Sequence, residues 1–171
     1  MDKSYVAAFL DGEGSVSFSL RVNSDGSLLL YPQIRFGNTN KEVIDALRNF
    51  LKLQGIKANQ NVFRTGRKRP YHELQITGFR NILKFIELVE DKSIVKKKHL
   101  EIMKRFCTRR IKLHEASRIY WATHSHLKLQ KKFVAYTRED LEDFLELLKL
   151  NGRKLSPIGQ ERLARLKARF F

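Results

Sequence analysis

The sequence predicts an α+β fold with a short N-terminal helix, two strand–strand–helix units and a helical C-terminal segment. Three observations support this prediction. Residues 15–22 alternate apolar and polar side chains, the strand–strand–helix pattern occurs twice before residue 91, and apolar residues beyond it recur at helical spacing. Antiparallel hairpins of this kind can leave one sheet face in solvent while helices cover the other. A chain of 171 residues has room for one domain with a sizeable core.

The first helix is expected over residues 4–12, with Ser4 as its N-cap. The following strand, 15–22, has Val, Phe and Leu on one face and Ser and Arg on the other. Residues 24–27 contain Asp-Gly, which predicts a hairpin turn because such turns need positive φ. The return strand is expected over residues 28–37.

The second unit repeats this order. A capping box at 39–42 predicts the start of a helix, and Gly55 fits the region after its end. Strands are expected at 57–64 and 70–77 around a basic turn, followed by a helix at about 79–90.

The remainder is predicted to be helical. Helices are expected at about 93–113 and 138–150, and Ser156-Pro157 predicts the start of a last helix. The pattern does not place residues 117–136. We therefore expect a core over 1–113 and a helical extension of the same domain over 114–171.

The charge indicates the class of partner. The chain has 34 Lys and Arg against 18 Asp and Glu, a formal net charge of +16. A domain this basic favours a polyanion, foremost nucleic acid, over an anionic membrane surface. The apolar fraction of 42% excludes a disordered basic tail. The single cysteine, Cys107, excludes a disulfide framework and a Cys-based zinc site, and we expect it to be buried.

No secretory signal or membrane span is predicted, because the apolar run that starts near the N-terminus breaks at Asp11. We therefore expect an intracellular protein, in a bacterial or archaeal cytoplasm or an organelle, that is not secreted and has no membrane partner.

The segment Val6–Gly14, VAAFLDGEG, carries the chemistry. Ala8 and Gly12 lie four residues apart on one helical face, so a second helix can approach closely there. Glu13, expected just past the helix end, offers a carboxylate suited to a hard divalent cation. Two such helices side by side bring two carboxylates together, as two-metal phosphodiester hydrolysis requires.

At these nine residues the sequence resembles the LAGLIDADG homing endonuclease family, and two strand–turn–strand–helix units follow, as in that fold. The resemblance covers residues 4 to about 113 well and the C-terminal third loosely. Val6, Ala8 and Glu13 depart from the usual Leu, Gly and Asp, although Glu keeps the metal ligand. The resemblance implies an αββαββα fold with a saddle-shaped antiparallel sheet over double-stranded DNA.

The chain contains one copy of the motif, and single-copy members of the family act as homodimers. The resemblance therefore implies that the protein pairs with itself through Ala8 and Gly12 and cuts a long, near-palindromic target.

The resemblance also implies catalytic roles. Glu13 corresponds to the metal-binding acid, and the Gly12 carbonyl is a further ligand for Mg²⁺, with Mn²⁺ or Ca²⁺ able to occupy the site. Asn40 falls where the family often has a Gln that positions water. Lys96 falls where a Lys lies near the scissile phosphate, and Lys98 is the alternative, because the register within three lysines stays open.

Strand alternation, counted from Glu13, predicts the DNA-facing side chains. Their types hydrogen-bond to base edges in a major groove. The third strand stays open between Asn59, Asn61 and Phe63 on one face and Gln60 and Arg64 on the other. The basic turn residues are expected to meet phosphates or bases at the outer turn. The full predicted set is Ser15, Ser17, Ser19, Arg21, Asn23, Tyr31, Gln33, Arg35, Tyr71, Glu73 and Gln75 on the strands and Arg67, Lys68 and Arg69 in the turn.

We therefore expect a site-specific, metal-dependent double-strand DNA endonuclease that acts as a homodimer. An RNA-binding intron maturase on the same scaffold is the first alternative, and RNA would then be a partner. A non-catalytic, sequence-specific DNA-binding regulator is the second. The acid at position 13 argues against a regulator, since a carboxylate beside phosphate repels it unless a metal neutralises the pair.

Overall fold

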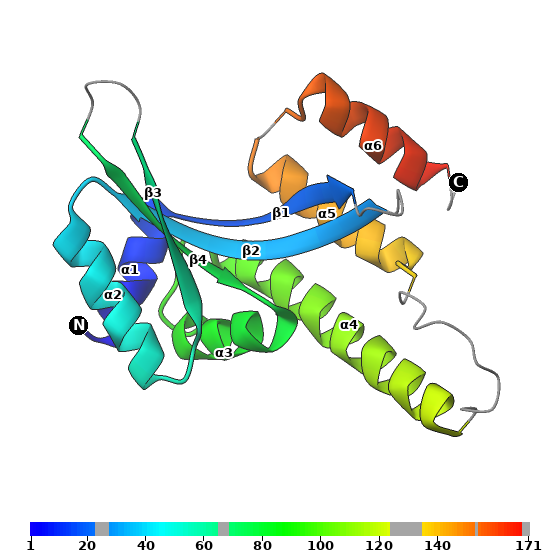
Figure 1. Cartoon of the computed structure of the whole chain (residues 1–171), viewed down its shortest axis with the longest axis horizontal. Helices are drawn as coiled ribbons and strands as arrows, with labels where there is room; N and C mark the ends of the chain where they lie inside the picture. Colours follow the sequence, from blue (N-terminus) through cyan, green and yellow to red (C-terminus); the bar gives the residue numbers. More distant parts are fainter. Residues whose placement is uncertain (23–27, 65–68, 124–134, 153, 169–171) are drawn as a thin grey trace.

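The computed structural model describes residues 1–22, 28–64, 69–123, 135–152 and 154–168, and of Trp121 only the backbone. Four strands and six helices follow one another in the described chain (Figure 1). In chain order they are α1 (Lys3–Glu13), β1 (Gly14–Val22), β2 (Leu28–Asn38), α2 (Lys41–Leu53), β3 (Ala58–Phe63), β4 (Tyr71–Thr77), α3 (Phe79–Val89), α4 (Lys97–Thr123), α5 (Arg138–Leu150) and α6 (Pro157–Lys167).

The strands form one antiparallel sheet in the order β1-β2-β4-β3. Figure 1 shows β1 and β2 as long, curved strands, with α1, α3 and α4 on the convex side of the curve. The α+β architecture predicted from the sequence is confirmed.

Even-numbered strand residues form the helix-covered face. Val16, Ile34 and Ile76 lie side by side across three strands and are fully buried. The Phe18 ring packs edge-on against Phe106 of α4, with 4.6 Å between the ring centroids. This alternation puts the apolar residues under the helices and leaves the odd-numbered, polar residues on the other face.

Three helix boundaries differ from the sequence expectation. Asp2 rather than Ser4 caps α1, because its side chain accepts the Tyr5 backbone N–H. Glu13 lies in the last turn of α1 and not past it. Asn40 rather than Thr39 caps α2, since its Oδ1 accepts the Glu42 backbone N–H at 2.9 Å.

The fourth helix is longer than expected and begins later. α4 runs through the expected core boundary at residue 113 to Thr123, so no break in secondary structure marks that boundary. Its start is delayed from 93 to Lys97, because the backbone N–H groups of Ile94, Val95 and Lys96 are bound by a side chain of α1.

A cluster of charged side chains joins α4 to α5. Arg109 and Arg110 of α4 bind Asp140 at 2.8 and 3.2 Å, and Arg109 also pairs with Asp143. Asp140, Asp143 and Arg110 are buried. Hydrogen bonds to Asp140 and Asp143 raise the pKa of Arg109 despite the opposing effect of its burial. The cluster fixes the C-terminal extension on the core.

The extension also closes one edge of the sheet. Asn151 Nδ2, after α5, donates to the Val16 carbonyl at 3.0 Å, and Arg162 Nη1 of α6 donates to the Leu20 carbonyl at 3.2 Å. Tyr136, which precedes α5, both accepts from the Leu30 N–H and donates to the Leu30 carbonyl. The C-terminal segment thus contacts both β1 and β2, as part of one structure with the sheet.

Cys107 is buried, as expected, and burial raises the pKa of its thiol. None of the helices in the described ranges has the length and apolar character needed to cross a membrane.

Candidate nucleic-acid interface and metal site

The end of α1 presents an exposed carboxylate. Glu13 is exposed, and the described residues give it no hydrogen-bond or ion-pair partner. It stands where α1 passes into β1, and a Cβ on Gly14 would meet Leu10 at 2.7 Å, so only glycine allows this tight passage. The acid therefore lies at the border between the motif helix and the sheet.

Asp11, two residues earlier, is fully engaged. Its carboxylate accepts the Ser93 hydroxyl at 2.6 Å and the backbone N–H groups of Ile94, Val95 and Lys96 at 2.7, 3.2 and 2.9 Å. Burial alone would raise the pKa of Asp11, but these four hydrogen bonds outweigh it and lower the pKa. Asp11 is therefore a connector between α1 and the start of α4, which leaves Glu13 as the free acid of the motif.

The Asp11 contact brings Lys96 to the end of the motif helix. The Lys96 backbone N–H donates to Asp11, so the Lys96 backbone lies at the last turn of α1, the helix whose final residue is Glu13. Lys98 points elsewhere, since its Nζ lies 3.6 Å from Glu146 of α5. Because Lys98 is paired with Glu146, Lys96 is the better candidate of the two lysines that the sequence left open, and its role near the scissile phosphate stays a prediction.

Asn40 lies between the end of β2 at Asn38 and the start of α2, as the N-cap of that helix. Its Oδ1 accepts the Glu42 N–H at the start of α2 with one of two lone pairs, so the second lone pair and the amide N–H groups remain to contact a further group. Its expected role in positioning water stays a prediction.

Among the described residues, one face of α1 is left uncovered. Ala8 and Gly12 are exposed, whereas Val6, Ala7 and Leu10 are fully buried. A Cβ on Gly12 would meet nothing within 4 Å. A second helix can therefore lie against this face of α1.

One chain does not build a metal site by itself. The described residues contain no group of three or more His, Cys, Asp or Glu side chains that could hold a metal ion. Glu13 and the Gly12 carbonyl are oxygen donors of the kind that Mg²⁺ and Ca²⁺ use, but these ions need six or more ligands. The residues fit a divalent ion that takes its other ligands from outside the chain.

The sheet face away from the helices gathers the predicted DNA-facing side chains. The strand register puts Ser15 beside Arg35, Arg35 beside Gln75, and Ser17 beside Gln33. We call this surface the odd face. Of the predicted set, it carries Ser15, Ser17, Ser19, Arg21, Tyr31, Gln33, Arg35, Tyr71, Glu73 and Gln75.

Three predicted residues, Asn23, Arg67 and Lys68, lie outside the described residues, and Arg69 is exposed beyond the end of β3. The contact of all these residues with DNA stays a prediction.

The register decides the question that the sequence left open in the third strand. Asn59, Asn61 and Phe63 pair with Gln75, Glu73 and Tyr71, so they lie on the odd face. Gln60 lies on the other face, where its side chain donates to Asp45 of α2 at 3.0 Å. Thr77, which pairs with Gln33, also belongs to the odd face. Parity alone could not assign the β3 residues, because β3 has polar and apolar side chains on both faces, whereas Thr77 follows the alternation of β4.

Side chains on the odd face hold one another in place. Gln75 donates to Gln33, and Gln33 donates to Ser17 at 3.4 Å, which forms a chain across three strands. The Arg21 guanidinium lies 4.0 Å from the centre of the Tyr31 ring. The Tyr71 ring occupies the space over Gly37, where a Cβ would clash with it. The face therefore presents an ordered set of donors and acceptors.

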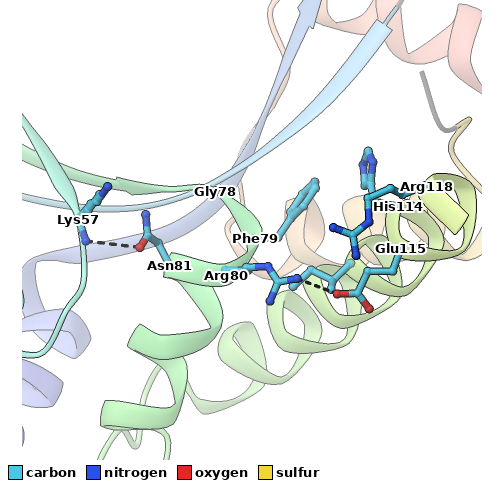
Figure 2. A pocket seen from close by; sticks show the side chains of 9 residues that line it. Lys57, Gly78, Phe79, Arg80, Asn81, His114, Glu115 and Arg118 are labelled. Carbon is cyan, nitrogen blue, oxygen red and sulfur yellow. Dashed lines mark hydrogen bonds and ion pairs between the residues drawn. The ribbon is translucent and has the colours of Figure 1, made fainter. Parts of the chain in front are cut away.

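A cleft of about 580 Å³ lies elsewhere, between the start of α3 and one side of α4 (Figure 2). Lys57, Arg80 and Arg118 line it, and Glu115 binds Arg80 at 2.7 Å. Burial and the charge of Arg110 lower the pKa of His114, whose ring lies 5.8 Å from Phe79. Because its one acid is paired, this cleft lacks a free carboxylate of the kind that Glu13 offers.

Comparison with known proteins gives one family. Residues 1–90 match the model of the LAGLIDADG-like domain. No curated protein sequence matches the chain.

Solved structures with the same fold are either about as long as this chain or about twice as long. The homing endonuclease I-TnaI is 17% identical at a TM-score of 0.54, with 98% of this chain and 99% of that chain covered. The homing endonuclease I-CvuI, solved in complex with the I-CreI target in the presence of Mg with the DNA not cleaved, is 12% identical at a TM-score of 0.54, with 90% of this chain and 96% of that chain covered.

The I-SmaMI LAGLIDADG homing endonuclease, bound to cleaved DNA, is 18% identical at a TM-score of 0.59, with 96% of this chain but 48% of that one covered. I-SmaMI has also been solved on uncleaved DNA in the presence of calcium ions. At these identities the structures show a shared fold.

Proposed function

The chain belongs to the LAGLIDADG family, and from this premise we propose that it is a site-specific, divalent-metal-dependent DNA endonuclease. The observation that carries the proposal is the exposed Glu13 carboxylate at the junction of the motif helix and the polar odd face. An acid in that position of a chain with net charge +16 faces a polyanion, where it is unfavourable unless a cation joins it. Such a protein works on DNA inside a cell.

The active unit is a homodimer. The exposed small residues Ala8 and Gly12 leave room for the same helix of a second copy, and each copy then brings one Glu13. Full-length agreement with I-TnaI, against half of I-SmaMI, supports a chain that supplies one half of the enzyme. Twofold symmetry of the protein implies a long, near-palindromic target.

The residues divide the chemistry among them. Glu13 and the Gly12 carbonyl would hold the divalent ion, which when bound activates water and stabilises charge on the phosphate. Mg²⁺ is the expected ion, and Mn²⁺ or Ca²⁺ can occupy the same oxygen donors. Lys96 stabilises negative charge at the scissile phosphate, and the Asn40 amide orients water. Asp11 holds the Lys96 backbone at the last turn of α1 by accepting its N–H.

The direct test is cleavage of a plasmid library with Mg²⁺ by the wild-type protein and by Glu13→Gln. We expect the wild type to cut one site and the variant to lose at least about 100-fold in rate while its DNA binding persists, because a neutral amide is a poor metal ligand. Glu87→Gln, a change of another exposed acid, on α3, is the control and should cut like the wild type.

Undiminished cutting by Glu13→Gln contradicts the proposal. Binding to a structured intron RNA without any DNA cleavage would identify a maturase, and DNA binding without cleavage by the wild type would identify a regulator.

A further inference from the structure

One ion pair lies in the middle of the odd face. Arg35 Nη1 of β2 is 3.6 Å from Glu73 Oε2 of β4, and the two side chains are 28% and 16% exposed. The Arg35 Nε is buried and has no hydrogen-bond partner in the described part of the chain. Among the ion pairs of the described residues, this one alone joins two strands on the polar face.

The neighbours of the pair restrict its movement. Gln75, directly beside Arg35 on β4, is tied to Gln33. Tyr71, on the other side of Glu73 along β4, lies over Gly37. The pair is therefore flanked on the odd face by Gln75 and Tyr71, and both of its side chains keep partial exposure there.

The pair matches one base pair chemically. Arg offers a fork of N–H donors that fits O6 and N7 of guanine, and a carboxylate accepts from N4 of cytosine. In a G·C pair these acceptors and this donor lie next to each other in the major groove. Arg35 has five N–H donors, so contact with Glu73 leaves others for a base.

The charge of the Arg35–Glu73 pair also favours a role in reading bases. An isolated carboxylate on a DNA-binding surface is repelled by the phosphates, whereas Arg35 neutralises Glu73 and leaves the pair with no net charge. Such a pair adds little to sequence-independent attraction, which follows net charge. Its contribution is to choose among bases.

From these observations we infer that Arg35 and Glu73 act as one unit that reads a G·C base pair once in each half of the DNA target. The inference rests on the proposed function, which it deepens by assigning a specificity-determining pair.

The test is selection of cleaved or, with Ca²⁺, bound sequences from a randomised duplex pool. The key variant is Arg35→Gln with Glu73→Gln, which keeps the net charge of the chain and polar side chains at both positions. Its matched control is Arg80→Gln with Glu115→Gln, which removes the exposed ion pair drawn in Figure 2, on the helix side of the sheet. Arg35→Lys, which keeps the charge but loses the fork, is the second variant.

We expect the wild type to enrich G·C at one symmetry-related position in each half-site. The double variant and Arg35→Lys should lose roughly 5- to 150-fold of that preference at this position only, and the control should keep it. Unchanged preference at every position, or an equal loss at all positions by a variant whose melting temperature is unchanged, overturns the inference alone. A wild type that selects no sequence overturns the proposed function and the inference together.

Discussion

The two edges of the sheet are treated differently. At the β1 edge, the C-terminal extension donates hydrogen bonds to the carbonyls of Val16 and Leu20. At the β3 edge, no hydrogen bond from another element to the outer backbone appears among the described residues. β3 instead has polar and partly exposed side chains, which discourage strand pairing. The extension thus stabilises the outer edge of β1, the strand that leads directly from Glu13 onto the odd face.

Removing the anchor of the extension should have the largest effect. Asp140→Asn removes the buried carboxylate shared by Arg109 and Arg110, leaves Arg109 with Asp143 alone and weakens the capping box at Thr137, so we expect a loss of about 3–5 kcal/mol in the free energy of unfolding. Glu161→Gln, in an exposed pair on α6, should change it by less than about 0.5 kcal/mol. Urea unfolding measures both, and equal effects would show that the buried cluster does not hold the extension.

The contacts at the start of α4 should contribute less to the free energy of unfolding, and their contribution should depend on pH. Asp11→Asn removes the charge that accepts four hydrogen bonds, and we expect a loss of about 1–2 kcal/mol at neutral pH. Because the pKa of Asp11 in the folded state lies below 3.8, its stabilising contribution is full above about pH 5 and disappears as the pH falls through that lower value.

The measurement is unfolding at several pH values, with Asp91→Asn, a change of an exposed acid after α3, as the control. A stability difference between wild type and Asp11→Asn that stays constant down to pH 2 would contradict the assignment.

Removing the hydrogen bonds at the β1 edge should have the smallest effects on the free energy of unfolding. Asn151→Ala and Arg162→Ala each remove one hydrogen bond to β1, and we expect each to cost about 0.5–1.5 kcal/mol. Val62→Thr at the β3 edge should change stability by less than about 0.5 kcal/mol, since Val62 is 50% exposed. If the β3 change costs as much as the β1 changes, the two edges are equivalent and the comparison fails.

Much of the fold could be predicted because strand period and burial are local properties. Alternation from Val16 to Leu20 and from Leu30 to Phe36 identified the core face, and Ser156-Pro157 identified the start of α6. The ends of α1 and α4 could not be predicted as well. Asp2 competes with Ser4 as a cap, and α4 begins where Asp11, 85 residues before Lys96, takes the backbone donors.

The candidate site likewise has features that local sequence patterns predict and features that they do not. The motif identified Glu13, and parity identified the odd face of β1, β2 and β4, because both depend on near neighbours in sequence. The face of β3 and the Arg35–Glu73 pair depend on which strands lie side by side, and the order β1-β2-β4-β3 is not written in any local pattern. The ion pair of Lys98 with Glu146 could not be predicted either, because Glu146 lies in the extension and no local pattern shows that it is near Lys98.

In the proposed function, cleavage depends on two copies of α1 that bring two Glu13 side chains to one DNA backbone. The most direct measurement uses a mixed dimer, purified with two different tags, in which one copy is wild type and the other Glu13→Gln. We predict that this dimer binds the target like the wild type but no longer makes double-strand breaks, because each cut needs both carboxylates. Double-strand cleavage at the wild-type rate, or a protein that remains a monomer on its target, would contradict the account.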